Sequence, residues 1–176
     1  MKRNRETVNE TIEVQDRLLF KKLDGTVIEN VHEYVKEWVK NNEYGTVTIG
    51  CDSQEHSRYI KYATTIIMHS KDRYGVGHGG HVIVSVFKDF SKNMKSDVYT
   101  KLWAETEVTI DVAKMVGNIG KKITIHLDYN SDESKYSNVL YNAGIGYAKG
   151  LGFEAFGKPY AWASSHTADK FAKKGN

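Results

Sequence analysis

The stretch Val47-Thr-Ile-Gly-Cys-Asp-Ser-Gln54 is an apolar run that ends on an acid followed by two small polar side chains. Its β-branched residues alternate with Thr48 and Gly50, which is typical of a buried strand. A carboxylate at the mouth of a buried strand packs poorly, so Asp52 is a candidate for chemistry. The alternative is that Asp52 only caps the strand end, because Asp-Ser is a common turn sequence.

Two later segments end in the same way. Lys122-Ile-Thr-Ile-His-Leu-Asp128 places an acid after a second apolar strand, and Ala163-Ser-Ser-His-Thr-Ala-Asp-Lys-Phe171 places Asp169 near the start of a final helix. Carboxylates that converge on one edge of a sheet repel one another unless cations lie between them, so we expect a Mg²⁺ or Mn²⁺ site. Ordinary roles remain open: Asp128 precedes a loop rich in Asx-turn residues, and the helix dipole favours an acid at Asp169.

Length and composition exclude several classes of protein. The 176 residues suffice for one well-packed domain, and 40% hydrophobic with 27% charged residues is ordinary for a soluble globular protein. No apolar run approaches the ~20 residues needed to span a bilayer, so we expect no membrane partner and a cytoplasmic location. The single cysteine, Cys51, cannot form an internal disulfide. A net charge of +3 does not by itself indicate nucleic-acid binding.

The first quarter of the chain predicts an accessory unit. Residues 1–18 read as an irregular arm, and the Asp-Gly pair within 19–28 predicts a short hairpin. Asn30 followed by Glu33 predicts a capped helix over residues 31–41. We therefore expect residues 1–44 to pack on a main domain formed by residues 45–176, the two making one globular unit.

The main domain alternates strands and helices in an informative order. Three strands with short links predict an antiparallel meander, and helix-linked strands follow it. The order β-β-β-α-β-α-β-α predicts an α/β architecture, with a mixed sheet and helices on its faces. The expected strands are 46–52, 58–68, 82–87, 122–128 and 153–156; the expected helices are 97–119, 135–149 and one from about 165.

This order and five motifs carry a resemblance to a known family. The motifs are Gly50-Cys-Asp-Ser-Gln54, His126-Leu-Asp128, Gly150-Leu-Gly-Phe153, Lys158-Pro159 and Ala161-Trp-Ala-Ser-Ser-His-Thr-Ala-Asp-Lys170. Over roughly residues 20–173 the chain resembles the ribonuclease H fold, and in particular the bacterial and phage ribonuclease H-like family of the YkuK type. The resemblance implies a divalent-metal nuclease site, but a fold alone does not fix the substrate.

A two-metal site would need one glutamate besides Asp52, Asp128 and Asp169, and the long helix offers two. At about 100° per residue, Glu105 falls on the apolar stripe that must face the sheet, whereas Glu107 falls on the solvent side. The sequence therefore predicts that Glu105 completes the site. The stripe comprises Leu102, Val108, Thr109, Val112, Val116 and Ile119, and the solvent side comprises Thr100, Asp111, Lys114 and Asn118.

His166 lies three residues before Asp169, so on an α-helix the two side chains share a face. The pair resembles the last-helix ligand pair of some Holliday-junction resolvases. His166 is therefore a candidate catalytic residue that binds metal or transfers a proton to the leaving group. The alternative is that it helps to cap the helix.

Three histidines, His69, His78 and His81, surround the glycine-rich stretch 74–80. They suggest zinc, but no cysteine accompanies them, and a structural zinc normally has four well-spaced ligands. A mobile hairpin loop that touches substrate or a neighbouring subunit is a better interpretation than zinc. A solvated loop without function is favoured over both.

Basic residues supply candidate nucleic-acid contacts. The stretch 87–95 mixes lysines with aromatic residues, which suits phosphates and a stacked base, and the C-terminal tail is also basic. The ordinary alternatives are an exposed connection and a solvated helix face. The candidate contacts are Lys92, Lys95, Lys170, Lys173 and Lys174.

The function that these patterns favour is a metal-dependent nuclease that hydrolyses phosphodiester bonds of RNA, DNA or a hybrid. Two Mg²⁺ or Mn²⁺ ions would be held by Asp52, Glu105, Asp128 and Asp169. One alternative is a nucleic-acid-binding module that keeps the fold without turnover, and another is an interaction scaffold. No pattern in the sequence fixes an oligomeric state.

Overall fold

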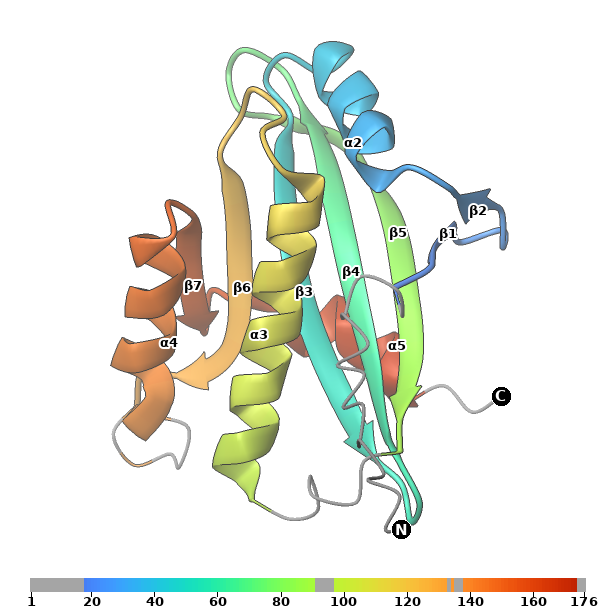
Figure 1. Ribbon diagram of the computed structural model, residues 1–176. Helices are drawn as coiled ribbons and strands as arrows, with labels where there is room; N and C mark the ends of the chain where they lie inside the picture. The colour runs from blue at the N-terminus through green and yellow to red at the C-terminus, as the bar shows by residue number, and fades with distance from the viewer. Residues whose placement is uncertain (1–17, 91–96, 133, 135–137, 174–176) are drawn as a thin grey trace, which may run out of the picture.

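The computed structural model describes residues 18–90, 97–132, 134 and 138–173. Over these residues it contains a seven-stranded mixed sheet with the strand order β2-β1-β5-β4-β3-β6-β7, so the predicted α/β fold is confirmed (Figure 1). The strands are β1 Phe20–Lys22, β2 Val27–Ile28, β3 Thr46–Glu55, β4 Ile60–Lys71, β5 Gly77–Asp89, β6 Ile123–Asn130 and β7 Glu154–Lys158. The helices are α2 Val31–Lys40, α3 Val98–Val116, α4 Asn138–Gly150, the π-helix η2 Ala163–Ala168 and α5 Asp169–Lys173.

Strand β3 lies in the interior of the sheet, and its residues 47–51 are buried on both faces. It pairs antiparallel with β4 and parallel with β6. Helices α2, α3 and α4 cover one face of the sheet, and η2 with α5 covers the other (Figure 1). Val47 and Ile49 are fully buried between these layers. This arrangement places the end of β3 between helices from two distant parts of the chain.

The N-terminal hairpin extends the sheet rather than lying apart from it. Phe20 of β1 pairs with Ser85 of β5 and is fully buried. Gly25 takes the positive φ of 91° that the hairpin turn needs. Asn30 caps α2 by accepting a hydrogen bond from the backbone N–H of Glu33, as predicted. The division at residue 44 stays a prediction.

Two expectations about strand lengths were wrong. Strand β3 continues to Glu55, so Asp52 lies within the strand and not at its end. The glycine-rich stretch is strand from Gly77 onward, since Gly80 pairs with His69 of β4. Ladder pairing with a long neighbouring strand outweighs the low strand propensity of glycine. The turn itself is shorter and is held by Asp72, whose side chain accepts from the backbone N–H groups of Tyr74 and Val76.

The start of the final helix also differs from the expectation. Residues 163–168 form a π-helical turn, and the α-helix begins only at Asp169. The α-helical spacing that would place His166 and Asp169 on one face therefore does not apply between them. π-helical turns occur frequently at functional sites.

Strands β3 and β6 separate where the candidate site begins. Their parallel pairing ends at Gly50 and His126, although β3 runs on to Glu55 and β6 to Asn130. Figure 1 shows β6 curving away from β3 toward its carboxyl end. Beyond this last pair, no backbone hydrogen bonds of the sheet join the described residues of β3 to those of β6, so a gap opens between the two strands. No helix in the described part of the chain is long and apolar enough to cross a bilayer.

Candidate metal and nuclease site

Asp52 lies on the face of β3 that η2 and α5 cover. Its neighbours Cys51 and Ser53 point to the opposite face, where Cys51 packs with Val108 of α3. Asp52 forms a side-chain hydrogen bond with Asp169. Burial raises the pKa of Asp52 to about 6, with further contributions from that hydrogen bond and from the charge of Asp128.

Asp169 is the first residue of α5 and binds Lys173 one turn later, with Nζ 2.8 Å from Oδ1. Burial raises the pKa of Asp169, but the hydrogen bonds from Lys173 and Asp52 outweigh this and hold the pKa below its ordinary value. Below about pH 6 the two aspartates therefore share one proton, which resides on Asp52. Two carboxylates that share a proton would release it to solvent when a cation binds between them.

Asp128 lies beside Asp52 on the neighbouring strand. Gly50 is paired with His126, so continuing the register by two residues places Asp52 opposite Asp128, beyond the last ladder pair. Lys158 of β7 binds Asp128, with Nζ 2.7 Å from Oδ1. Two neighbouring strands thus carry two carboxylates side by side, and their role as metal ligands stays a prediction.

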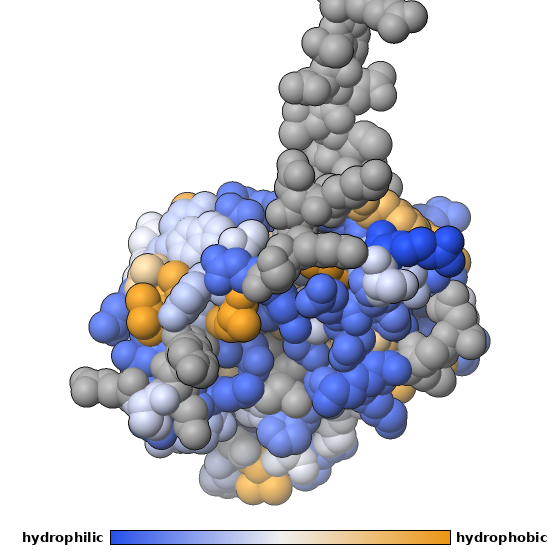
Figure 2. All heavy atoms as spheres, turned by 90° about the horizontal axis from the view of Figure 1, so that it is seen from below, coloured by the Kyte–Doolittle hydropathy of each residue, from blue (hydrophilic) through white to orange (hydrophobic). Residues whose placement is uncertain are grey.

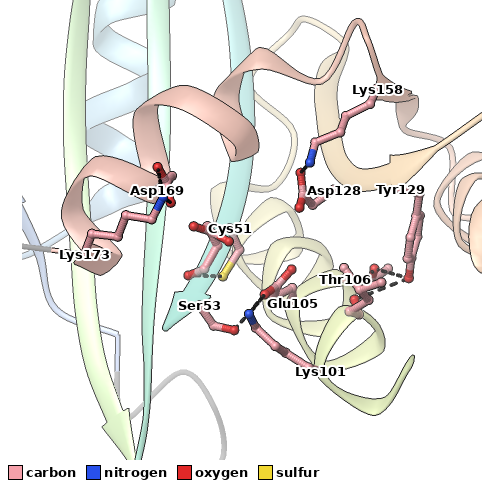
Figure 3. Close-up of polar contacts among 12 residues, drawn as sticks. Cys51, Ser53, Lys101, Glu105, Thr106, Asp128, Tyr129, Lys158, Asp169 and Lys173 are labelled. Atoms are coloured by element: carbon pink, nitrogen blue, oxygen red, sulfur yellow. Dashed lines mark hydrogen bonds and ion pairs between the residues drawn. The ribbon is translucent and has the colours of Figure 1, made fainter. Parts of the chain in front are cut away.

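Glu105 lies on α3, which covers the other face of β3, and is only 4% exposed. Ser53 Oγ donates a hydrogen bond of 2.7 Å to Glu105 Oε1, and Lys101 Nζ lies 3.9 Å from that oxygen. The other oxygen, Oε2, is buried without a hydrogen-bond partner among the described residues. Burial raises the pKa of Glu105 to about 8, and the charges of Asp52 and Asp128 add to it. In Figure 3 the Glu105 and Asp128 carboxylates point toward one another.

Glu107 lies on the exposed side of α3, where the helical period placed it. Its Oε1 accepts a hydrogen bond of 3.1 Å from Trp103 Nε1 one turn earlier. The helical periodicity of the sequence therefore assigned Glu105 and Glu107 to the correct faces of α3. Glu107 is a natural control for Glu105 because the two differ only in the face that they occupy.

Three lysines contact the site acids, a pairing that the sequence analysis did not predict, although it named Lys173 as a candidate nucleic-acid contact (Figure 3). Lys101, Lys158 and Lys173 lie beside Glu105, Asp128 and Asp169 respectively. We call them the site lysines. Two of them stand four residues from their acid on one helix, a spacing that could have indicated them. Lys158 comes from another strand and carries no such signal.

The acids suit a divalent cation in their chemistry, though not in their present positions. Four carboxylates supply oxygen ligands of the kind that Mg²⁺ and Mn²⁺ prefer, and the unpartnered Oε2 of Glu105 is an acceptor that a cation would satisfy. Within residues 18–90, 97–132, 134 and 138–173, however, no three acidic, histidine or cysteine side chains are grouped closely enough to hold a metal. The site lysines take the role of counter-ions instead. Metal binding would require the acids to turn away from them.

His126 is buried beside the site and fixes the start of η2. Its Nδ1 accepts a hydrogen bond of 3.1 Å from the backbone N–H of Ala163. Burial lowers the pKa of His126 to about 4, so the ring is neutral and can act as this acceptor. Trp162 packs edge-on against the ring. His126 thereby positions the segment that carries Asp169, a role that the sequence analysis did not assign.

The other candidate residues are dispersed. His166 is exposed on the π-helical turn, and Lys170 is exposed on α5. The glycine-rich region does not gather its histidines: His69 contacts Trp162, His78 lies 3.3 Å from Asp72, and His81 bonds the Tyr34 hydroxyl at 2.7 Å. Three separate partners argue against a zinc site there. The candidate contacts Lys92, Lys95 and Lys174 lie outside the described residues.

Comparison with known proteins agrees with this geometry. The family model described as ribonuclease H-like matches residues 26–173, which is most of the chain and includes all four site carboxylates. No curated protein and no solved structure shows significant similarity to the chain. The family supports a nuclease-like module with nucleic acid as its partner at a coarse level. The chain belongs to the ribonuclease H-like family.

Proposed function

We propose that this protein is a divalent-metal-dependent nuclease that hydrolyses phosphodiester bonds of RNA, DNA or a hybrid. The observation that carries the proposal is the buried Glu105 carboxylate, whose Oε2 has no hydrogen-bond partner among the described residues. A buried acceptor of this kind is costly in a purely structural role. Asp52 and Asp128, whose charges act on Glu105, would join it around a cation once the acids turn away from the site lysines.

Asp52, Glu105, Asp128 and Asp169 would hold Mg²⁺ or Mn²⁺. When bound, two such ions activate the attacking water and stabilise the leaving oxygen. Asp52 would lie between the other acids, because it is hydrogen-bonded to Asp169 and close to Asp128. Ser53 would hold Glu105 in one orientation through Oε1 and leave Oε2 for the cation. His126 would keep η2 and Asp169 in place through the backbone of Ala163.

The site lysines would change partners on substrate binding. Their ammonium groups neutralise the acids while no cation is present. Once the acids bind a cation, Lys158 and Lys173 can turn to the phosphates of the substrate, which carry the same charge as the acids. Lys158 and Lys173 are partly exposed, so both can reach a bound strand.

The experiment incubates the purified protein with labelled single strands, duplexes, hybrids and junctions in Mg²⁺, Mn²⁺ or EDTA. Cleavage of at least one substrate that EDTA abolishes supports the proposal. Asp52→Asn should remove that cleavage, whereas Asp111→Asn, at an ion-paired acid on the outer side of α3, should not. Cleavage that persists in EDTA and in Asp52→Asn would overturn it.

A second candidate is a nucleic-acid-binding module without turnover. The pairing of three acids with lysines favours it, because such ion pairs satisfy the acids without a metal. In that case strands bind equally well in EDTA and in Mg²⁺, and no substrate of the panel is cleaved under either condition.

A further inference from the structure

Three aromatic side chains form a stack at the tip of the β3–β4 hairpin. The ring centroids of His56 and Tyr59 are 4.6 Å apart at 26°, and those of Tyr59 and Phe90 are 5.3 Å apart at 52°. We call His56, Tyr59 and Phe90 the aromatic stack. Phe90 is its outer member and is 63% exposed. A large aromatic ring held by a neighbouring ring and open to solvent can receive another flat ring.

Positive charge surrounds the aromatic stack. Lys88 Nζ lies 4.9 Å from the centroid of the Tyr59 ring, and Arg58 in the hairpin turn is exposed. The nearest acids, Glu55 and Asp89, both pair with Ile60, which packs on the α3 side of the sheet. Residues directly opposite on paired strands share a face, so these two acids point away from Lys88. The side of the sheet that carries Lys88 is therefore suited to an anion.

The aromatic stack and Asp52 lie on the same face of the sheet. Asp52 pairs with Ala63, which shares a face with Lys61 two residues earlier. Lys61 pairs with Lys88, whose Nζ lies over the Tyr59 ring, so the stack is on that same face. The stack is roughly 13 Å along the strand direction from Asp52, one strand spacing across. A strand whose phosphate lies at Asp52 can therefore place a nearby base on Phe90.

We propose that the aromatic stack binds an unpaired base of the substrate, with Lys88 and Arg58 contacting the adjacent phosphates. This rests on the proposed nucleic-acid substrate and narrows it to a strand with a single-stranded segment, because the bases of a duplex are already stacked on one another. A combination of basic groups with an exposed ring is the usual chemistry of single-strand binding. Figure 2 views this end of the molecule, whose visible surface is largely hydrophilic with small separate hydrophobic patches. A broad apolar protein interface would look different.

The test is equilibrium binding in EDTA, where no cleavage is required. The probes are a fluorescently labelled single strand, a duplex of equal length and a single strand with abasic positions. Phe90→Leu keeps an apolar side chain but removes the aromatic face. It should weaken single-strand binding by about 5- to 100-fold, the range for losing one stacked base, and leave duplex binding unchanged. Tyr74→Leu is the matched control, because Tyr74 is 82% exposed in the β4–β5 turn at the opposite end of the sheet.

The abasic strand separates stacking from a general loss of structure. The wild type should bind it about as weakly as Phe90→Leu binds the intact strand, and Phe90→Leu should bind both strands equally. Equal loss of affinity for the intact and abasic strands in Phe90→Leu would overturn the proposal, and so would wild-type binding that ignores the missing bases. Base-dependent binding without cleavage in any metal would contradict only the nuclease function. Cleavage without base-dependent binding would contradict only the stacking site.

Discussion

Ser53 Oγ lies 2.7 Å from Glu105 Oε1 and donates a hydrogen bond to it, which joins strand β3 to helix α3 next to Asp52. Ser53 and Asp52 are consecutive, so their side chains point to opposite faces of the sheet. The hydrogen bond thus fixes one acid on the α3 face directly beside another on the α5 face. The pairing of β3 with β6 ends just before this point, so side chains from the two faces of the sheet can approach one another there.

The two glutamates of α3 should respond differently to loss of charge. Glu105→Gln keeps the Ser53 contact but removes a buried carboxylate, so we expect it to eliminate metal-dependent cleavage. Glu107→Gln alters an exposed side chain that only receives the Trp103 hydrogen bond, so activity should stay within about twofold and stability within about 0.5 kcal/mol. Single-turnover cleavage and thermal melting measure both variants. The reverse pattern would place the site on the other side of α3.

The stability of the metal-free protein should fall as the pH rises. The pKa of Glu105 is raised to about 8 and that of Asp52 to about 6, both above their ordinary values. Glu105 and Asp52 therefore bind more protons in the folded state, and the stability that they contribute is lost as the pH rises to about 8. The lowered pKa of His126 acts in the opposite direction below its ordinary value of 6.5, so the test uses the interval above that value. We expect Tm in EDTA to decrease from about pH 6.5 to 8, by the equivalent of a few kcal/mol at most.

The same titration in Glu105→Gln isolates the contribution of that residue. Above about pH 6 the Asp52 proton is already lost in the folded state, so the remaining decrease belongs to Glu105. The variant should show a nearly level Tm between about pH 6.5 and 8. A wild-type Tm in EDTA that is constant or rises over this range would show that Glu105 is not protonated in the folded protein.

Lys158 should compete with divalent ions for Asp128. Removing the ammonium group in Lys158→Met leaves Asp128 more available, so the Mg²⁺ concentration that gives half of the thermal stabilisation should decrease by about 2- to 5-fold. The KM for a nucleic-acid substrate should rise in the same variant, since the proposed phosphate contact is lost. Lys122→Met, which breaks a pair with Glu154 elsewhere on the sheet, is the control. An unchanged Mg²⁺ requirement would mean that Lys158 does not occupy a cation position.

Lys170 should contribute to binding through charge alone. It is exposed on α5, whereas the neighbouring Lys173 is engaged by Asp169. Lys170→Ala should weaken binding to strands of every sequence and reduce the slope of log K against log salt concentration by about one. Lys149→Ala, at an exposed lysine near the end of α4, should leave the slope unchanged. An unaltered slope in Lys170→Ala would identify Lys170 as part of a solvated helix face.

The sequence predicted the parts of the fold that depend on periodicity. The period of an α-helix separated Glu105 from Glu107, and the apolar runs before Asp52 and Asp128 identified two strands that are neighbours in the sheet. Patterns of this kind work because each residue's face is set by its own segment. The predicted order of strands and helices is confirmed for the same reason.

Features that depend on tertiary contact were not predictable. Gly77–Gly80 forms strand only because β4 offers it a partner. The π-helical turn at 163–168 begins at Ala163, whose backbone N–H donates a hydrogen bond to His126 from a distant part of the sequence. Lys158 of β7 forms an ion pair with Asp128 of the neighbouring strand β6. In each case the decisive partner belongs to another segment, and no local pattern identifies it.

The most direct test of the central claim is an Mn²⁺ titration of the protein followed by electron paramagnetic resonance, which counts bound ions without any substrate. The wild type should bind two ions, and Asp52→Asn should lose at least one while keeping its thermal stability. Glu107→Gln should bind as the wild type does. Absence of Mn²⁺ binding by the wild type at millimolar concentration, or equal binding by Asp52→Asn, would contradict a metal site built on these carboxylates.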